Sequence, residues 1–139
     1  MDREALIRNV VDMHRALDYL ATRADIDSRK IAFVNASPGA LCFANTAVNS
    51  RYAALITIGG GLHRTNQGDP QLSIFRFAPF VRVPKLMING KYGQLSPEAV
   101  SVAPLFRLLS EPKRGCSSRA VTGRRSRSVC RSSTGFWMR

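Results

Sequence analysis

Three short, mainly apolar runs, each stopped by a turn, constrain the fold of this chain more than any other feature. The runs are Ile31–Val34, Ala53–Ile58 and Lys85–Asn89. Apolar residues at successive positions of a strand are typical of a parallel sheet that is buried on both faces. Because helical patterns precede and separate the runs, we predict an α/β fold with about three parallel strands and flanking helices.

Three segments carry helical patterns. The segment from Asp2 to Arg23 has one apolar stripe at spacings of four and three, made by Leu6, Val10, Met13, Leu17 and Leu20. A second helix is predicted over residues 40–48. A third runs to about Leu109 after Ser96, a candidate N-cap, and Pro97, a candidate first helical residue. The stretch from 62 to 83 is predicted to be mainly loop.

The positive charge is unevenly distributed along the chain. The formal net charge is +12. Residues 1–112 hold 13 Lys and Arg and all 9 Asp and Glu, whereas residues 113–139 hold 8 basic residues and no acid. We therefore divide the chain into a domain, 1–112, and a basic Arg/Ser-rich tail, 113–139. The tail has too few apolar residues for a core, so we predict that it is disordered.

The turn after the first strand carries the motif that bears on chemistry. It reads Asn35-Ala36-Ser37-Pro38-Gly39 and stands between a predicted buried strand and a predicted helix. In this setting the chain resembles the α/β-hydrolase superfamily, closest to serine hydrolases of the dienelactone-hydrolase-like and prolyl-oligopeptidase-like kinds. The resemblance covers roughly residues 12–112, the C-terminal part of such a domain, and includes Gly59-Gly60-Gly61-Leu62 and the segment 83–92.

The resemblance places Ser37 at the nucleophile position of a G-x-S-x-G elbow. It also implies a triad acid after the third strand, where this sequence has Gly93, and a histidine beyond Pro112, where it has none. Pro38 follows the serine and lacks the backbone N–H that normally lines the oxyanion hole. The pattern therefore predicts a truncated, degenerate serine hydrolase that is inactive as encoded.

Two other functions stay open. Ser37 could work with His63, and with Asp69 as the acid, in an active esterase or peptidase-like hydrolase; His14 lies on the helix before the elbow and is expected to be structural. Alternatively, the tail could bind nucleic acid, because clustered arginines release counterions from phosphates. Translation out of the ancestral frame is the plainer explanation of the tail.

The remaining expectations concern partners and surroundings. Without earlier strands, the strand before Ser37 would be an open sheet edge, which allows self-association. The three cysteines are far apart in sequence, so we predict reduced thiols and no zinc site. We expect no cofactor and no metal. The charged start and the absence of a long apolar run predict a cytoplasmic chain outside the membrane.

Overall fold

The computed structural model describes residues 3–36, 40–62, 72–94, 96–118, 128–132 and 137–138. The helices and short helical turns are α1 (Arg3–Ala21), η1 (Ser28–Lys30), α2 (Ala40–Val48), α3 (Ile74–Phe77), η3 (Ala78–Phe80), η4 (Glu98–Val102) and α4 (Ala103–Leu108). The strands are β1 (Ala32–Ala36), β2 (Ala54–Ile58), β3 (Lys85–Gly90), β4 (Lys113–Ser118), β5 (Ser128–Ser132) and β6 (Trp137–Met138).

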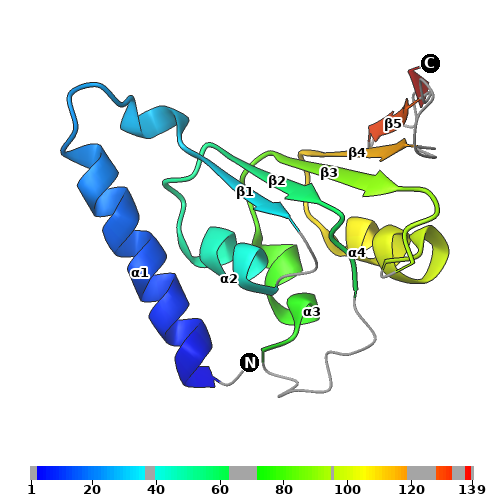
Figure 1. Ribbon diagram of the computed structural model, residues 1–139, viewed down its shortest axis with the longest axis horizontal. Coiled ribbons are helices and arrows are strands. Elements are labelled where there is room, and N and C mark those ends of the chain that lie inside the picture. The colour runs from blue at the N-terminus through cyan, green and yellow to red at the C-terminus, as the bar shows by residue number, and fades with distance from the viewer. Residues whose placement is uncertain are drawn as a thin grey trace.

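The strands form one sheet in the order β1-β2-β3-β4-β5-β6 (Figure 1). The first four are parallel, and each joins its neighbour through a connection that contains helix. The α/β class predicted from the sequence is thus confirmed, with four parallel strands in place of about three. Strands β5 and β6 are antiparallel.

The fourth parallel strand corrects the expected start of the disordered tail. Residues 113–118 pair with β3 from Lys85↔Lys113 to Gly90↔Ser118. Such pairing uses backbone groups, so it does not require apolar side chains. Gly115 also suits this position, because a Cβ added there would lie 3.3 Å from the Phe106 ring. The sheet therefore continues past Pro112, and residues 119–127, 133–136 and 139 of the predicted tail lie outside the described residues.

A disulfide corrects the prediction of reduced thiols. Cys116 is disulfide-bonded, and its partner in the β4–β5 register is Cys130. Directly opposed residues of an antiparallel pair have Cα atoms at a separation that a disulfide can span. Linear spacing hides such a pair, because only the strand pairing brings the two positions together. Cys42 keeps its thiol and is buried.

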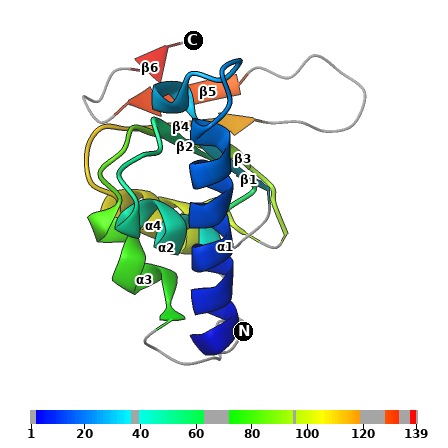
Figure 2. The ribbon, with the colours of Figure 1, turned by 90° about the vertical axis from the view of Figure 1, so that its left-hand side faces the viewer.

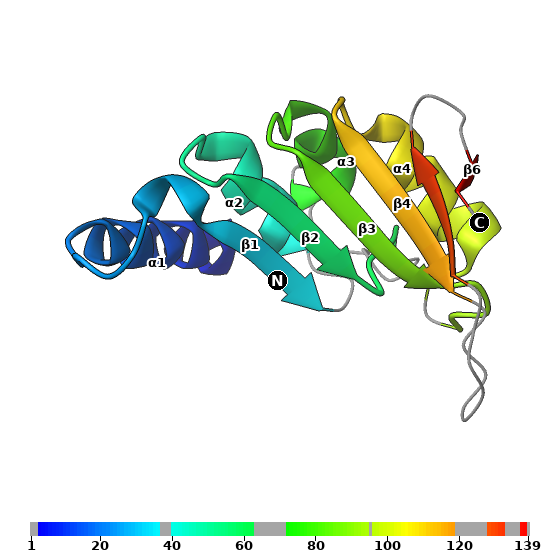
Figure 3. The same cartoon turned by 90° about the horizontal axis from the view of Figure 1, so that it is seen from above.

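Helices α2, α3 and α4 lie on one side of the sheet, and α1 runs toward the same side next to β1 (Figures 1 and 2). The core lies between the sheet and these helices and includes Leu17, Phe43, Leu55, Met87 and Leu105, each at most 4% exposed. We refer to this side as the covered face. The other side is the bare face, which no described helix covers (Figure 3).

Two local predictions differ from the structure. The expected loop 62–83 contains α3 and η3, which Ile74 and Ala78 anchor in the core. The expected helix after Ser96 is a π-helical turn, η4, followed by α4, with Pro104 in the first turn of α4. Proline cannot donate to the preceding turn, which favours a change of helix type at this point. Ser96 does not cap the helix; its hydroxyl lies 3.5 Å from the Gly59 carbonyl.

Candidate functional site

The candidate elbow is the connection between β1 and α2. Strand β1 ends at Ala36 and α2 begins at Ala40, so three residues carry the chain from the carboxyl end of the sheet into a helix. Ser37, Pro38 and Gly39 themselves lie outside the described residues. What the structure describes is the strand before these three residues and the helix after them, between which a nucleophile elbow would stand.

Asn35 stands where the family motif has its first glycine. Its side chain makes a hydrogen bond with the Cys42 thiol on α2, so the larger residue links the strand to the helix that follows the elbow. Burial raises the pKa of Cys42 to about 12, and the hydrogen bond with Asn35 offsets only part of this effect. Since the thiolate is the reactive form, Cys42 is inert at neutral pH.

The glycine run after β2 is fixed at the same end of the sheet. Gly59 has a φ of 68°, a conformation that glycine adopts without strain, and its N–H donates to the Ile88 carbonyl at 2.8 Å. The Asn89 amide donates to the Gly60 carbonyl at 2.6 Å. The Ser101 hydroxyl donates to the Leu62 carbonyl at 2.7 Å. The chain is thus held by β3 and η4 up to the residue before His63.

The position expected for the triad acid is a tight turn without a carboxylate. After β3 the Gly93 N–H donates to the Gly90 carbonyl at 3.1 Å. Glu98 follows at the start of η4, and its Oε2 lies 3.4 Å from the Ser117 hydroxyl on β4. A carboxylate therefore does reach the carboxyl end of the sheet, at β4. Spacing along the chain gives no sign of this contact.

Of the two histidines, the structure describes only His14. His14 lies on α1, and its backbone carbonyl accepts a hydrogen bond from Arg51, which precedes the amino end of β2. Its Nε2 is buried without a hydrogen-bond partner among the described residues. This location agrees with a structural histidine remote from the elbow. His63 and Asp69 lie outside the described residues.

Two buried polar atoms near the elbow are unsatisfied within the described structure. Thr57 on β2 is 1% exposed, and Asn89 on β3 is 6% exposed. The Thr57 hydroxyl and the Asn89 Oδ1 have no hydrogen-bond partner there. Thr57 lies opposite Asn35 in the β1–β2 register, so its hydroxyl is next to the end of the strand that leads to Ser37, whereas Asn89 lies one strand further along the sheet. The sequence did not single out either residue.

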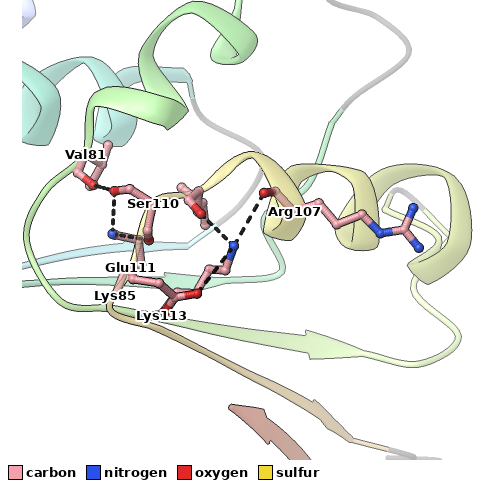
Figure 4. A network of polar contacts seen from close by, with 7 residues as sticks. Val81, Lys85, Arg107, Ser110, Glu111 and Lys113 are labelled. Atoms are coloured by element: carbon pink, nitrogen blue, oxygen red, sulfur yellow. Dashed lines mark hydrogen bonds and ion pairs between the residues drawn. The ribbon is translucent and has the colours of Figure 1, made fainter. Parts of the chain in front are cut away.

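The amino ends of the strands carry a denser polar network (Figure 4). The Lys85 ammonium donates to the Ser110 carbonyl at 2.7 Å and to its hydroxyl at 3.2 Å, and that hydroxyl donates to the Val81 carbonyl. Lys113 donates to the Leu109 carbonyl at 2.6 Å and so satisfies the C-terminal end of α4. Burial lowers the pKa of Lys85 to about 8.

A surface cleft of about 470 Å³ lies at these amino ends too. Its walls come from α1, η1 and the segments that lead into β1 and β2, including Leu17, Arg29, Arg51 and Tyr52. It is therefore at the opposite end of the sheet from the candidate elbow. In open parallel sheets ligands bind outside the carboxyl ends of the strands, so we keep the elbow as the candidate site.

Comparison with known proteins shows the fold of this chain. No protein-family model matches the sequence, and no curated protein matches it. Among solved structures, the esterase domain of a Rhodothermus marinus protein is 17% identical, with a TM-score of 0.59 over 78% of this chain and 56% of that one. Acetyl xylan esterase from Paenibacillus sp. R4 is 16% identical, with a TM-score of 0.60 over 81% and 45%.

These similarities show an α/β-hydrolase-like fold, as the resemblance in the sequence implied. The chain spans about half the length of the two solved structures. In the part of the chain that the structure covers, no three His, Cys, Asp or Glu side chains gather where they could hold a metal ion. None of the described helices is long and apolar enough to cross a membrane.

Proposed function

We propose that this chain is an esterase-like serine-hydrolase domain that has lost hydrolytic activity. The observation that supports the proposal is the turn after β3, where the resemblance implies the triad acid: there the Gly93 N–H closes on the Gly90 carbonyl, and the turn carries no carboxylate. A serine becomes a nucleophile only when a histidine takes its proton and an acid orients that histidine. Loss of the acid alone lowers the rate by about 10⁴.

The oxyanion hole adds to this deficit. Pro38 follows Ser37 and has no N–H to donate to the developing oxyanion. Removing one such donor costs roughly 10² to 10³ in rate. In this proposal Ser37 marks the ancestral nucleophile position and does not attack a substrate.

Active-site labelling tests the proposal directly. We expect a fluorophosphonate probe to label wild type no more than Ser37→Ala, and we expect a small activated ester to be hydrolysed equally slowly by both. Ser50→Ala, which changes an exposed serine before β2, is a matched control. Strong labelling that Ser37→Ala abolishes and Ser50→Ala preserves would overturn the proposal.

The fixed glycine run favours a second candidate, an active esterase or peptidase-like hydrolase with His63 as the base. Because Gly60 and Leu62 are tied to β3 and η4, the chain reaches His63 from a held position at the carboxyl end of β2, beside β1. Asp69 would then serve as the acid. This candidate requires ester hydrolysis that His63→Ala removes and His14→Ala retains. Hydrolysis that survives His63→Ala would exclude the assignment.

The charge of the tail supports a third candidate, nucleic-acid binding. Residues 113–139 contain 8 basic residues and no acid, and phosphate contacts made by such residues weaken steeply with salt. Replacing Arg124, Arg125 and Arg127 with serine should then abolish salt-sensitive binding of a single-stranded oligonucleotide. The same replacement at Arg3, Arg8 and Arg15 on α1 removes equal charge elsewhere. Equal losses in both triple variants would argue against a role specific to the tail.

A further inference from the structure

Two phenylalanines project into solvent from α3 and η3. Phe75 is 55% exposed and Phe80 is 61% exposed. The opposite side of the segment is anchored, because Ile74 and Ala78 are each at most 1% exposed and belong to the core. Five residues of such helix span about 8–10 Å, so the backbone positions of the two phenylalanines lie close together. The segment therefore presents two neighbouring apolar rings to solvent.

Exposed arginines accompany these rings. Arg76 directly follows Phe75 on α3 and is exposed. In the extended segment after η3, Val81 and Val83 are buried, so Arg82 between them points outward. Neither arginine forms an ion pair within the described residues. Residues 72–94 contain no acidic residue, so the charge around the rings is positive.

We call Phe75, Arg76, Phe80 and Arg82 the aromatic–basic surface. Helix α3 stands on the far side of α2 from the sheet (Figures 1 and 2). Both α3 and η3 contact α2, and η3 also contacts α4. The place of this surface therefore follows from contacts within the described chain, on the opposite side of the molecule from the bare face.

We propose that the aromatic–basic surface docks on the surface of an anionic lipid membrane. Phenylalanine side chains gain free energy on leaving water for the boundary of the acyl chains, and arginines are attracted to anionic headgroups. Acyl chains adapt to projecting rings, whereas a protein partner would have to supply a pocket for each ring. Such contact stays at the lipid surface and needs no helix that spans the bilayer. The proposal does not depend on the hydrolase assignment, because it uses no residue of the candidate elbow.

Vesicle binding tests the choice of partner. The full-length chain should co-sediment with phosphatidylcholine vesicles that contain about one third phosphatidylglycerol, and this binding should weaken as salt is raised. Vesicles of phosphatidylcholine alone should bind far less of the chain. Failure to bind the anionic vesicles would overturn the proposal and would favour a protein partner for the surface.

A double variant tests the rings without changing the charge. Phe75→Ser combined with Phe80→Ser should lower the partition coefficient on anionic vesicles roughly tenfold or more. Tyr19→Ser combined with Tyr92→Ser is the matched control, because these two aromatic side chains are 62% and 67% exposed. The control should bind like wild type, with the folding of both variants verified by circular dichroism. Equal binding by the two double variants would contradict the proposed contact.

A second pair of variants tests the charge. Arg76→Gln combined with Arg82→Gln should lower the partition coefficient roughly twentyfold at low salt, since each arginine near an anionic surface contributes about a factor of five. Arg124→Gln combined with Arg125→Gln removes the same charge from the basic tail and should have a smaller effect. Equal losses would show only the general attraction of a basic chain to anionic lipid, and the proposal would fail.

Fluorescence gives an independent measurement of the contact. In Phe75→Trp, the emission of the new tryptophan should shift to shorter wavelength on addition of anionic vesicles, and brominated acyl chains should quench it. Tyr19→Trp should change no more than wild type, whose single tryptophan is Trp137. A bound chain in which the tryptophan of Phe75→Trp is not quenched would show that another surface contacts the lipid, which would overturn the assignment.

Discussion

The two ends of the parallel sheet differ in whether their buried polar groups have hydrogen-bond partners within the described structure. At the amino ends, the Lys85 ammonium donates to Ser110, and the Ser110 hydroxyl donates to the Val81 carbonyl (Figure 4). The Lys113 ammonium donates to a carbonyl in the last turn of α4. At the carboxyl ends, the Thr57 hydroxyl and the Asn89 Oδ1 are buried without a partner in the described structure. An unsatisfied buried group costs more than a satisfied one contributes. The amino ends thus serve stability, and the carboxyl ends keep the unpaired groups that functional sites often retain.

The largest effect is expected at the glycine run of the carboxyl end. In Gly61→Ala the new Cβ would overlap the Ser101 hydroxyl and lie 3.0 Å from the Ser96 Cβ. Overpacking of this kind costs about 2 kcal/mol in the free energy of unfolding, which urea denaturation can measure. Gly90→Ala is the control, because a Cβ there meets nothing closer than 4.0 Å.

A double variant tests the cause. Ser101→Ala removes the overlapping hydroxyl, so Gly61→Ala should cost less in that background. If Gly61→Ala were tolerated as well as Gly90→Ala, the glycine run would be loose, and it could not hold His63 near the elbow.

The next effect is expected at the amino ends. Ser110→Ala leaves the Val81 carbonyl without its donor and Lys85 without one acceptor. We expect a loss of about 1–2 kcal/mol in the free energy of unfolding. Ser50→Ala at an exposed site should stay within about 0.5 kcal/mol. If both variants behaved alike, the polar network of Figure 4 would not stabilise the fold.

The pH dependence of stability probes the same network. Lys85 is 4% exposed, and burial lowers its pKa from 10.5 to about 8. Above pH 8 the unfolded chain holds this proton more tightly than the folded chain, so the free energy of unfolding should rise with pH. The rise attributable to Lys85 should be about 1 kcal/mol between pH 8 and 9.

Lys85→Met isolates this contribution, because it lacks the titrating amine and is otherwise close in size. The stabilities of wild type and Lys85→Met should be compared only up to about pH 9. Above that pH, the ionisation of Cys42 changes the free energy of unfolding in the opposite direction. Its pKa is raised from 9.0 to about 12, so stability should fall as pH rises through that interval. Parallel curves for wild type and Lys85→Met between pH 8 and 9 would contradict a titrating Lys85.

The sequence predicted the parts of the fold that depend on local pattern. The stripe from Leu6 to Leu20 predicted α1, and the apolar runs that end before Ser37 and Gly59 predicted β1 and β2. It missed β4, whose residues 113–118 look like the start of a polar tail. That strand exists through backbone pairing with β3 and through cover from Phe106, and neither leaves a mark in local composition.

Much of the candidate site was beyond sequence reasoning for a similar reason. The motif at Asn35–Gly39 predicts an elbow, and Gly93 stands where the resemblance implies an acid; both stay predictions. The contact of Glu98 with Ser117, the unsatisfied Thr57 and the disulfide at Cys116 all depend on which strands are neighbours. These are long-range consequences of topology, and spacing along the chain does not encode them.

The smallest effect is expected at Thr57. Thr57→Val replaces a buried hydroxyl that has no described partner with a methyl group of similar size. Removing an unsatisfied group relieves its desolvation penalty, so stability should stay within about 0.5 kcal/mol of wild type or increase. Thr46→Val is the matched control, because that buried hydroxyl donates to the Cys42 carbonyl at 2.6 Å. It should cost about 1 kcal/mol.

Which of the two threonine variants is the less stable decides whether the two ends of the sheet differ in hydrogen bonding. If Thr57→Val were the more destabilising, the Thr57 hydroxyl would have a partner in solution, such as a buried water bridging to Asn89. The carboxyl end would then be as fully satisfied as the amino end. If Thr57→Val is neutral or stabilising, an unpaired hydroxyl persists beside the elbow although a valine would fit. That outcome would favour a retained site over packing as the reason for a polar residue at this position.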